Sequence, residues 1–466
     1  MTEKLFHVTE KGSDVRTELL AGLTTFMTMA YILMVNSGMF AELPGVSYYA
    51  IYIATALSAA IGTILIGLLA NLPLAQASAM GSNAFFVYTV CLGFGLSYAN
   101  ALVLILLDGI AFVILTVTGL RRKIFEAIPT SVRLTIPAGV GLFIAFIGLQ
   151  NAGIVVADPE TFVNLTSLNL LFGSVSWSDV MPIAVTLAAL IAIAVMTCRG
   201  TKGAVLWGIF GGTILYYLLG FTVPGFYTDF GAGLNLNPFT AFYEFGTGAF
   251  GRVFTEGFDF SPYLADHNPA QLALLIGTTA LAFCLVDMFD TIGTLYGACA
   301  RGNLLTPEGE VPNMEQAMLA DAVATVCGAV CGTSTVSSYV EASAGIAEGG
   351  KTGLSAMTTG GLFLLAMFFS PVASLVPNCA TSAALIYVGI LMMDCAKKID
   401  WQNTVEAVPA FLTLAIMPMT YNISYGIAFG IISHVLIQVF SGKGKELNRG
   451  TWIIAGLFTV MFLVTH

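Results

Sequence analysis

The sequence predicts an all-α polytopic membrane protein, with fourteen transmembrane segments in a 7+7 inverted repeat and short extended (β) pieces in segments 3 and 10. Of its 466 residues, 57% are hydrophobic and only 9% are charged, and the mean hydropathy is +0.87. Soluble domains do not have this composition. Apolar stretches of about 17–22 residues recur along the chain, and the 17 Lys and Arg residues fall regularly between them.

Each predicted span is an apolar stretch long enough to cross the hydrocarbon core as a helix. The predicted spans are 17–40, 48–71, 74–96, 98–120, 131–150, 179–198, 203–222, 270–298, 316–331, 333–349, 353–370, 376–396, 403–420 and 422–441. A further apolar stretch at 451–465 is about 15 residues long, which is short for a span, and it follows a basic segment. We therefore expect an interfacial or packing helix there.

Positive charges mark alternate loops of this topology. With the N-terminus (Lys4, Lys11, Arg16) in the cytoplasm, the cytoplasmic loops contain Arg121, Arg122, Lys123, Arg133, Arg199, Lys202, Arg301, Lys351, Lys397, Lys398, Lys443, Lys445 and Arg449. The long loop 223–269 on the other side contains Arg252 and the acids Asp229, Glu244, Glu256, Asp259 and Asp266. This bias follows the positive-inside rule, so we expect a multi-pass protein of the cell (plasma or inner) membrane.

Charge and cysteine content exclude several other classes of protein. The formal net charge is −10, and because the sequence has no basic patch we expect no nucleic acid partner. Its eight cysteines, Cys91, Cys198, Cys284, Cys299, Cys327, Cys331, Cys379 and Cys395, lack the paired spacing of zinc or redox sites. We interpret them as packing residues and expect neither a metal nor a cofactor.

The two halves of the chain match in outline, about 250 residues apart, as internal repeats of transporters do. Pro129 before span five corresponds to Pro377 before span twelve, and Gly81 in span three corresponds to Gly332 at span ten. Seven spans in each half place the second half in the opposite orientation. An inverted repeat of this kind is typical of secondary transporters.

Spans three and ten are the least helical in composition. Residues 73–83 and 332–341 are rich in Gly, Ser and Thr, and residues 333–340 are β-prone. Extended backbone at membrane depth needs partners within the protein, so the two pieces are expected to pair with each other. Half-helices would then begin near Asn83 and Glu341 with free N–H groups, as at a binding site. The alternative is that the small residues only allow close helix packing.

Carboxylates lie within the predicted spans without basic partners. They are Asp108, Asp287, Asp290, Asp321, Glu341, Asp394 and Glu406, and each costs about 2.5–3.5 kcal/mol at the bilayer centre. Asp287 and Asp290 share a helix face, so we expect them to titrate as a coupled pair. Asp321, Asp394, Glu406 and Glu348 lie near predicted ends, where we expect solvated or capping side chains. The role of Asp108 stays open.

Four segments then identify a family. Residues 82–88, 138–150, 286–295 and 332–341, followed by 381–392, resemble the AzgA-like purine permeases of the nucleobase:cation symporter-2 group in the same order. The resemblance covers essentially the whole chain. It implies uptake of adenine, guanine or hypoxanthine with protons across the lipid bilayer, and no enzymatic activity. In span three the family's Pro-Gly-Met-Gly-Leu-Asn is replaced by residues 78–83, Ser-Ala-Met-Gly-Ser-Asn, which leaves the preferred purine open.

The resemblance also implies a division into two domains. Residues 17–120 and 270–370 would form a core domain, and residues 131–222 and 376–441 a gate domain. The segment 223–269 would be an extracytoplasmic loop and 442–466 a cytoplasmic or interfacial C-terminal segment. A homodimer through the gate domain is left open.

The resemblance assigns roles to individual residues. Asn83, Asp287, Asp290 and Glu341 match the binding and transport residues of the family. We expect Asp290 and Glu341 to accept hydrogen bonds from the base, and Asp287 with Glu341 to couple the proton. Backbone N–H groups near Gly81 to Asn83 and Ser338 to Glu341 would donate to base acceptors, and Phe85 or Phe289 would pack on the ring.

Three other functions are alternatives to purine transport. An anion transporter (sulfate or bicarbonate type) on the same inverted-repeat architecture would need a basic or neutral site, against which the interior acids argue. A membrane aspartyl hydrolase would use two facing carboxylates, but Asp287 and Asp290 lie on one helix. A passive channel has no need of carboxylates that change protonation.

Overall fold

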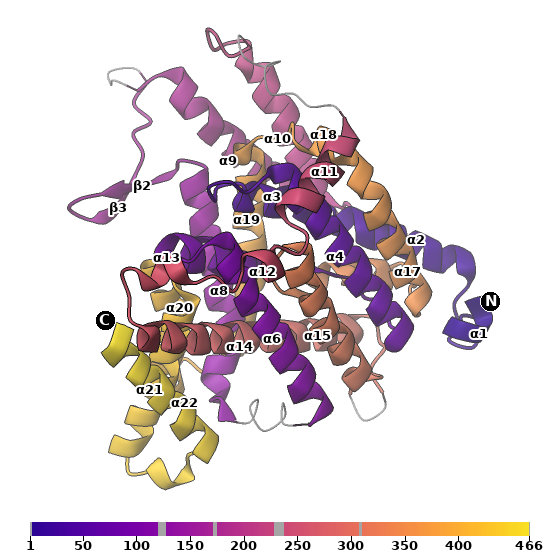
Figure 1. Ribbon diagram of the computed structural model, residues 1–466. Helices are drawn as coiled ribbons and strands as arrows, with labels where there is room; N and C mark the ends of the chain where they lie inside the picture. The colour runs from indigo at the N-terminus through magenta and orange to yellow at the C-terminus, as the bar shows by residue number, and fades with distance from the viewer. Residues whose placement is uncertain (1, 120–126, 171–174, 228–236, 307–309, 466) are drawn as a thin grey trace.

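The computed structural model describes residues 2–119, 127–170, 175–227, 237–306 and 310–465, so Arg121, Arg122, Lys123 and Asp229 lie outside the described part. It is mostly helical (Figure 1). Within the described residues, ten helices are long and apolar enough to cross a membrane, and four shorter apolar helices cover 80–93, 204–220, 404–420 and 449–463. The chain is therefore a multi-pass membrane protein.

One bundle joins helices from both ends of the sequence. Its members are α2 (Val15–Met29), α3 (Tyr31–Phe40), α4 (Tyr48–Leu69), α6 (Tyr98–Val117), α14 (Pro269–Arg301), α15 (Met314–Cys331) and α17 (Gly353–Ala366). Helix α15 packs against α4 and α6, and α17 packs against α2 and α4. The side chains of Asp14, Ser47 and Ser97 cap the first turns of α2, α4 and α6 by accepting backbone N–H bonds.

A second group of helices packs mainly on itself. It contains α8 (Thr130–Asn151), α9 (Trp177–Cys198), α10 (Ala204–Gly220), α19 (Asn378–Met392), α20 (Thr404–Thr420) and α21 (Ile423–Phe440). Helix α8 packs against α19 and α20, α9 packs against α10 and α19, and α20 packs against α21. Figure 1 shows α9, α10 and α19 together at one side of the molecule.

The connecting segments contain short elements. These are α1 (Thr2–Phe6), the hairpin β2 (Val155–Asp158) with β3 (Phe162–Leu165), α11 (Pro238–Gly248), α12 (Arg252–Thr255), α13 (Ser261–Leu264), η3 (Met367–Phe369), α18 (Ser370–Ala373), η4 (Met393–Lys398) and η5 (Gly444–Glu446). The hairpin between α8 and α9 is largely exposed.

The two predicted extended pieces exist and pair with each other. Strand β1 (Gln76–Ser78) runs antiparallel to β4 (Val336–Ser338), with Ala77 opposite Ser337. Both strands are fully buried. After β1 the chain continues as α5 (Met80–Ala84) and the π-helix η1 (Phe85–Gly93), and after β4 as the 3-10 turn η2 (Val340–Ala342) and α16 (Ser343–Ala347). The predicted pairing is confirmed, and the first half-helix begins three residues earlier than Asn83.

A threonine from a neighbouring helix completes the hydrogen bonding of each strand. Thr63 on α4 donates to the Gln76 carbonyl oxygen at 3.0 Å and accepts from the Gln76 N–H at 3.0 Å. Thr325 on α15 does the same for Val336, at 3.1 and 3.2 Å. Each hydroxyl therefore replaces a missing strand partner for buried backbone. The two strand segments therefore have equivalent hydrogen-bonding surroundings.

The last helix, α22 (Arg449–Thr465), runs back along α21. At its start the Thr451 hydroxyl donates to the Ala127 carbonyl oxygen at 2.5 Å. Near its end the Phe462 ring lies 5.5 Å from the Tyr425 ring and 5.3 Å from the Phe429 ring. Of the two alternatives predicted for 451–465, the contacts support a helix packed against the bundle.

Close contact between α4 and α17 depends on glycine. A Cβ at Gly353 would overlap the backbone of Gly67, which cannot move aside as a side chain can. We expect Gly353→Ala to lower the free energy of unfolding by about 1–3 kcal/mol, the usual cost of overpacking. Gly361→Ala, on the same helix and with open space around it, is the matched control. Thermal unfolding of the purified protein measures both, and equal melting temperatures would contradict the prediction.

Candidate functional site

A small cavity lies where the β1–α5 segment meets α8, α14 and α19. It is lined by Ala79, Gly81, Ser82, Ile136, Pro137, Val140, Val286, Asp290 and Met392, and its volume is about 10 Å³. That volume is near the minimum for one water molecule. A Cβ at Gly81 would overlap the Val140 side chain, so glycine is what lets α5 and α8 approach here.

Asp290 is the carboxylate on the wall of this cavity. The Ser337 hydroxyl, in the middle of β4, donates to its Oδ2 at 3.1 Å. Ser82 lies on the same wall, and its buried hydroxyl has no hydrogen-bond partner. The cavity therefore offers both a strong acceptor and a free hydroxyl to a polar ligand.

Glu341 lies just beyond β4 and interacts electrostatically with Asp290. The Tyr31 hydroxyl donates to its Oε1 at 2.8 Å, and Thr28 donates to its backbone oxygen at 3.3 Å. Both carboxylates are half-buried. Among the ion pairs formed by described residues, none involves Asp287, Asp290 or Glu341.

Asp287 lies one turn before Asp290 on α14 and is fully buried. Thr325, the residue that completes β4, also donates to Asp287 Oδ2 at 3.4 Å, while Oδ1 has no partner. Asp108 on α6, whose role the sequence left open, is fully buried beside Asp287, and neither of its oxygens has a partner.

The prediction that Asp321 is solvated or capping is wrong. Asp321 is fully buried and accepts hydrogen bonds from Gln76 at 2.9 Å and from Thr291 at 2.7 Å. Helix α15 begins at Met314, seven residues before Asp321. Neighbouring helices cover the Asp321 side chain, and its distance from the end of the span does not predict that burial. Asp394 and Glu348 do lie near the surface, paired with Lys397 and Lys202 at 2.5 Å.

Asn83 joins the two broken segments. Its amide oxygen accepts from the hydroxyls of Ser78, at 2.7 Å, and Ser334. Its backbone N–H bonds to the Ala79 carbonyl oxygen at 2.8 Å, so the N–H groups of Gly81 and Ser82 belong to the first turn, which has no intrahelical acceptors. Ser338 is buried, and its hydroxyl accepts from Gln76 at 3.3 Å.

The two candidate phenylalanines are both buried. Phe85 is fully covered, and its ring lies 4.7 Å from the Phe283 ring at an interplanar angle of 54°. Phe289 is 6% exposed. Neither ring belongs to the lining of the small cavity.

A separate polar cluster joins three segments near the ends of α3, η1 and α8. The Tyr88 hydroxyl donates to Glu42 Oε1 at 2.8 Å, and Asn151 Nδ2 donates to the same oxygen at 3.0 Å. Thr89 donates to the Tyr421 carbonyl oxygen in the turn between α20 and α21. Burial raises the pKa of Glu42 above its usual value, although the bonds from Tyr88 and Asn151 act in the opposite direction.

Sequence reasoning missed the neutral polar residues that hold these acids. They are Tyr31, Gln76, Thr325 and Ser337. The available signal was weak, because single Thr, Ser and Gln residues are common in membrane helices. Gln76 was the best clue, since a long amide within an apolar span needs buried partners.

The chain is similar to known permeases along nearly its whole length. Residues 16–429 match the model of the permease family. The adenine permease AdeP of Escherichia coli (strain K12) is 36% identical over 471 residues, covering 100% of this chain and 97% of the relative. The guanine/hypoxanthine permease PbuG of Bacillus subtilis (strain 168) is 38% identical over 466 residues, covering 98% of each chain.

Solved structures show the same fold at low sequence identity. The transmembrane domain of a cyanobacterium bicarbonate transporter, BicA, superposes with a TM-score of 0.59 at 14% identity and covers 90% of this chain and 96% of its own. SLC26A9 gives 0.58 at 13% identity over 92% of this chain and 66% of its own. From the family match and the full-length relatives, the chain belongs to the permease family, and its resemblance to the AzgA-like purine permeases is confirmed.

Proposed function

We propose that this protein takes up purine nucleobases (adenine, guanine or hypoxanthine) together with protons by alternating access. The observation that carries the proposal is the position of Asp290 and Glu341 at the paired strands, where neither forms an ion pair with a Lys, Arg or His among the described residues. Carboxylates accept the ring and exocyclic N–H groups of a purine, and the free Ser82 hydroxyl serves its acceptors. The chain is thus a transporter and not an enzyme.

The packing supports the proposed core and gate domains. Helices within 17–120 and 270–370 contact one another around the strand pair, while those within 131–222 and 376–441 pack mainly together. Counting the broken segments at 76–93 and 336–347 and the shorter helices α10 and α20 as crossings gives the proposed 7+7 repeat. The protein then lies in the plasma or inner membrane with its N-terminus on the cytoplasmic side.

The small cavity lies between these two proposed domains, because Pro137 and Val140 belong to the gate and Gly81 and Asp290 to the core. At about 10 Å³ it is too small for a purine. The gate must therefore separate from the core to admit the base. Rigid-body movement of one repeat unit against another is the usual means of alternating access.

Asp287 is the proposed proton-coupling residue. It is buried behind Asp290 and receives one long hydrogen bond from Thr325. A proton on Asp287 neutralises the core before it crosses the apolar gate, which lowers the cost of the movement. Because Thr325 also completes β4, protonation is linked to the strand that positions Ser337 and Glu341.

An anion transporter has the same architecture, as the structural neighbours demonstrate. The acids at the strand pair disfavour a negatively charged substrate here. Likeness at 14% identity concerns the fold, and function depends on the site residues.

The proposal is tested by uptake of radiolabelled adenine into cells that express the protein, with guanine, hypoxanthine, xanthine, uric acid and uracil as competitors. We expect purines to compete and a protonophore to abolish accumulation. Sulfate or bicarbonate uptake without purine uptake would contradict the proposal.

Asp290 should matter for binding. Removing a hydrogen bond to a charged group costs about 1.5–3 kcal/mol, so Asp290→Asn is expected to raise the KM for the transported purine about tenfold or more. Asp394→Asn, the same change at an exposed ion pair, is the control. An unchanged KM in Asp290→Asn would remove Asp290 from the site.

Asp287 should matter for coupling. We expect Asp287→Asn to abolish accumulation of purine against a gradient while preserving exchange of internal for external purine, because the neutral amide imitates the protonated acid. Counterflow from preloaded proteoliposomes measures the exchange. Uphill accumulation by Asp287→Asn would exclude the coupling role.

Glu42, in the polar cluster with Tyr88 and Asn151, should make the stability of the protein depend on pH. Its pKa is raised while it is buried, so its proton binds more tightly there than in an exposed or unfolded state. The resulting stabilisation is complete below the ordinary glutamate value of about 4.3 and is lost as the pH rises through the raised pKa. The difference in melting temperature between the wild type and Glu42→Gln should therefore shift in favour of the wild type on acidification. A pH-independent difference would contradict this.

A further inference from the structure

We infer that a second, larger cavity is an outer binding site for an uncharged purine, distinct from the site at Asp290. The inference rests on the proposed function and deepens it. The cavity has a volume of about 360 Å³ and lies between η1, the first part of α14, the α20–α21 turn and the end of α22. This volume lies within the range of small-molecule sites.

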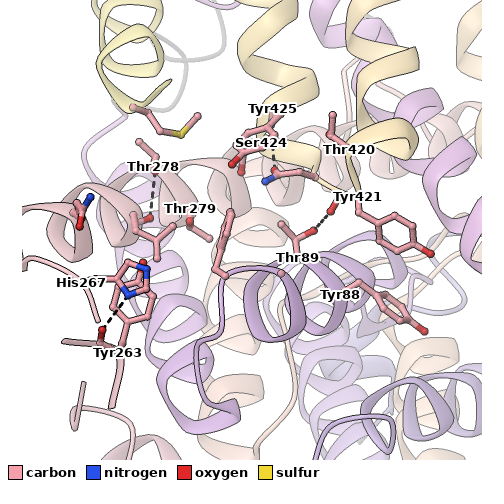
Figure 2. A pocket seen from close by; sticks show the side chains of 16 residues that line it. Tyr88, Thr89, Tyr263, His267, Thr278, Thr279, Thr420, Tyr421, Ser424 and Tyr425 are labelled. Atoms are coloured by element: carbon pink, nitrogen blue, oxygen red, sulfur yellow. Dashed lines mark hydrogen bonds between the residues drawn. The ribbon is translucent and has the colours of Figure 1, made fainter. Parts of the chain in front are cut away.

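The lining selects for a flat, neutral molecule. Figure 2 shows Tyr88, Tyr263, His267, Tyr421 and Tyr425 around the cavity, with hydroxyl groups between them. In the part of the chain that the structure describes, the lining contains no Asp, Glu, Lys or Arg. A flat ligand can stack on the aromatic rings of such a lining. The lining has no permanently charged side chain that would compensate the charge of an ion. An anion or a metal cation is therefore disfavoured.

The lining contains buried hydroxyl groups that a ligand could hydrogen-bond. Ser424 is 2% exposed, and its hydroxyl has no hydrogen-bond partner. Thr279, on the opposite wall, is also buried and lines the cavity. A purine presents donors and acceptors around its edge, so it can satisfy hydroxyl groups on two walls while its faces contact tyrosine rings.

The large cavity and the small cavity at Asp290 lie along the same two segments, α14 and α5–η1. On α14, Thr279, Phe283, Val286 and Asp290 follow one another at spacings of four, three and four residues, which places them on one side of the helix. Thr279 belongs to the large cavity, and Val286 and Asp290 belong to the small one. The rise of the helix separates Thr279 from Asp290 by about 16 Å.

The Phe85–Phe283 pair separates the two cavities. On the facing element, Gly81 lines the small cavity, Phe85 follows one turn later and Thr89 lines the large cavity. The two rings are 4.7 Å apart and both are fully buried. In this arrangement a base in the outer cavity therefore cannot touch Asp290, and the two sites are separate.

The test is the number of purine molecules that the purified full-length protein binds. Equilibrium dialysis uses the radiolabelled base that cells take up in the uptake assay. Over a range of purine concentrations we expect two sites per chain for the wild type, two for Asp290→Asn with one of them about tenfold weaker or more, one for Thr279→Phe, which fills the outer cavity, and one weakened site for the double variant. Thr213→Phe on α10, outside both cavities, is the matched control and should bind two.

The outcomes separate this inference from the proposed function. A single bound purine in the wild type whose affinity falls in Asp290→Asn and is unchanged in Thr279→Phe would overturn the outer site and leave the transporter proposal intact. No purine uptake or binding by the wild type would overturn the proposed function itself. If Thr279→Phe fails to fold, Ser424→Phe fills the cavity from the opposite wall, and its expected stoichiometry is also one.

Discussion

Satisfaction of extended backbone inside a membrane is the constraint on which the rest of this structure depends. Among the residues that the structure describes, β1 and β4 pair only with each other, so further hydrogen-bond partners must come from neighbouring helices. Thr63 and Thr325 supply them in matching ways. The strand pair is thereby hydrogen-bonded to α4 and α15, and the polar residues of the site lie on or beside this pair.

The acids depend on the same framework. Ser337 of β4 holds Asp290, Thr325 contacts both β4 and Asp287, and Gln76 of β1 holds Asp321. Each of these three carboxylates is therefore connected to a strand by hydrogen bonds through one neutral side chain. Because neutral donors supply only part of what a carboxylate needs, the charge state of the site can change without breaking an ion pair. That property suits the proposed exchange of protons and an uncharged base.

The same fold serves other substrates in its structural neighbours, one of them a bicarbonate transporter. The scaffold supplies the paired strands and the two groups of helices, and in the proposed function the residues on and around the strands set the charge of the ligand. In this chain those residues are acids and hydroxyls. The outer cavity follows the same logic with tyrosines and hydroxyls and without carboxylates.

The sequence by itself determined the membrane class and most helix positions, and it predicted the pairing of the two extended pieces and the acids Asp287, Asp290 and Glu341 inside the protein. These follow from apolar length, the Gly and Ser content of 73–83 and 332–341, and the cost of charge in lipid. Only the tertiary structure decided that Asp321 is buried, that Asn83 bridges the strand segments, and that Phe85 packs on Phe283. Burial and partners depend on residues about 200 or more positions apart, and neither periodicity nor local composition records which distant helix covers a given face.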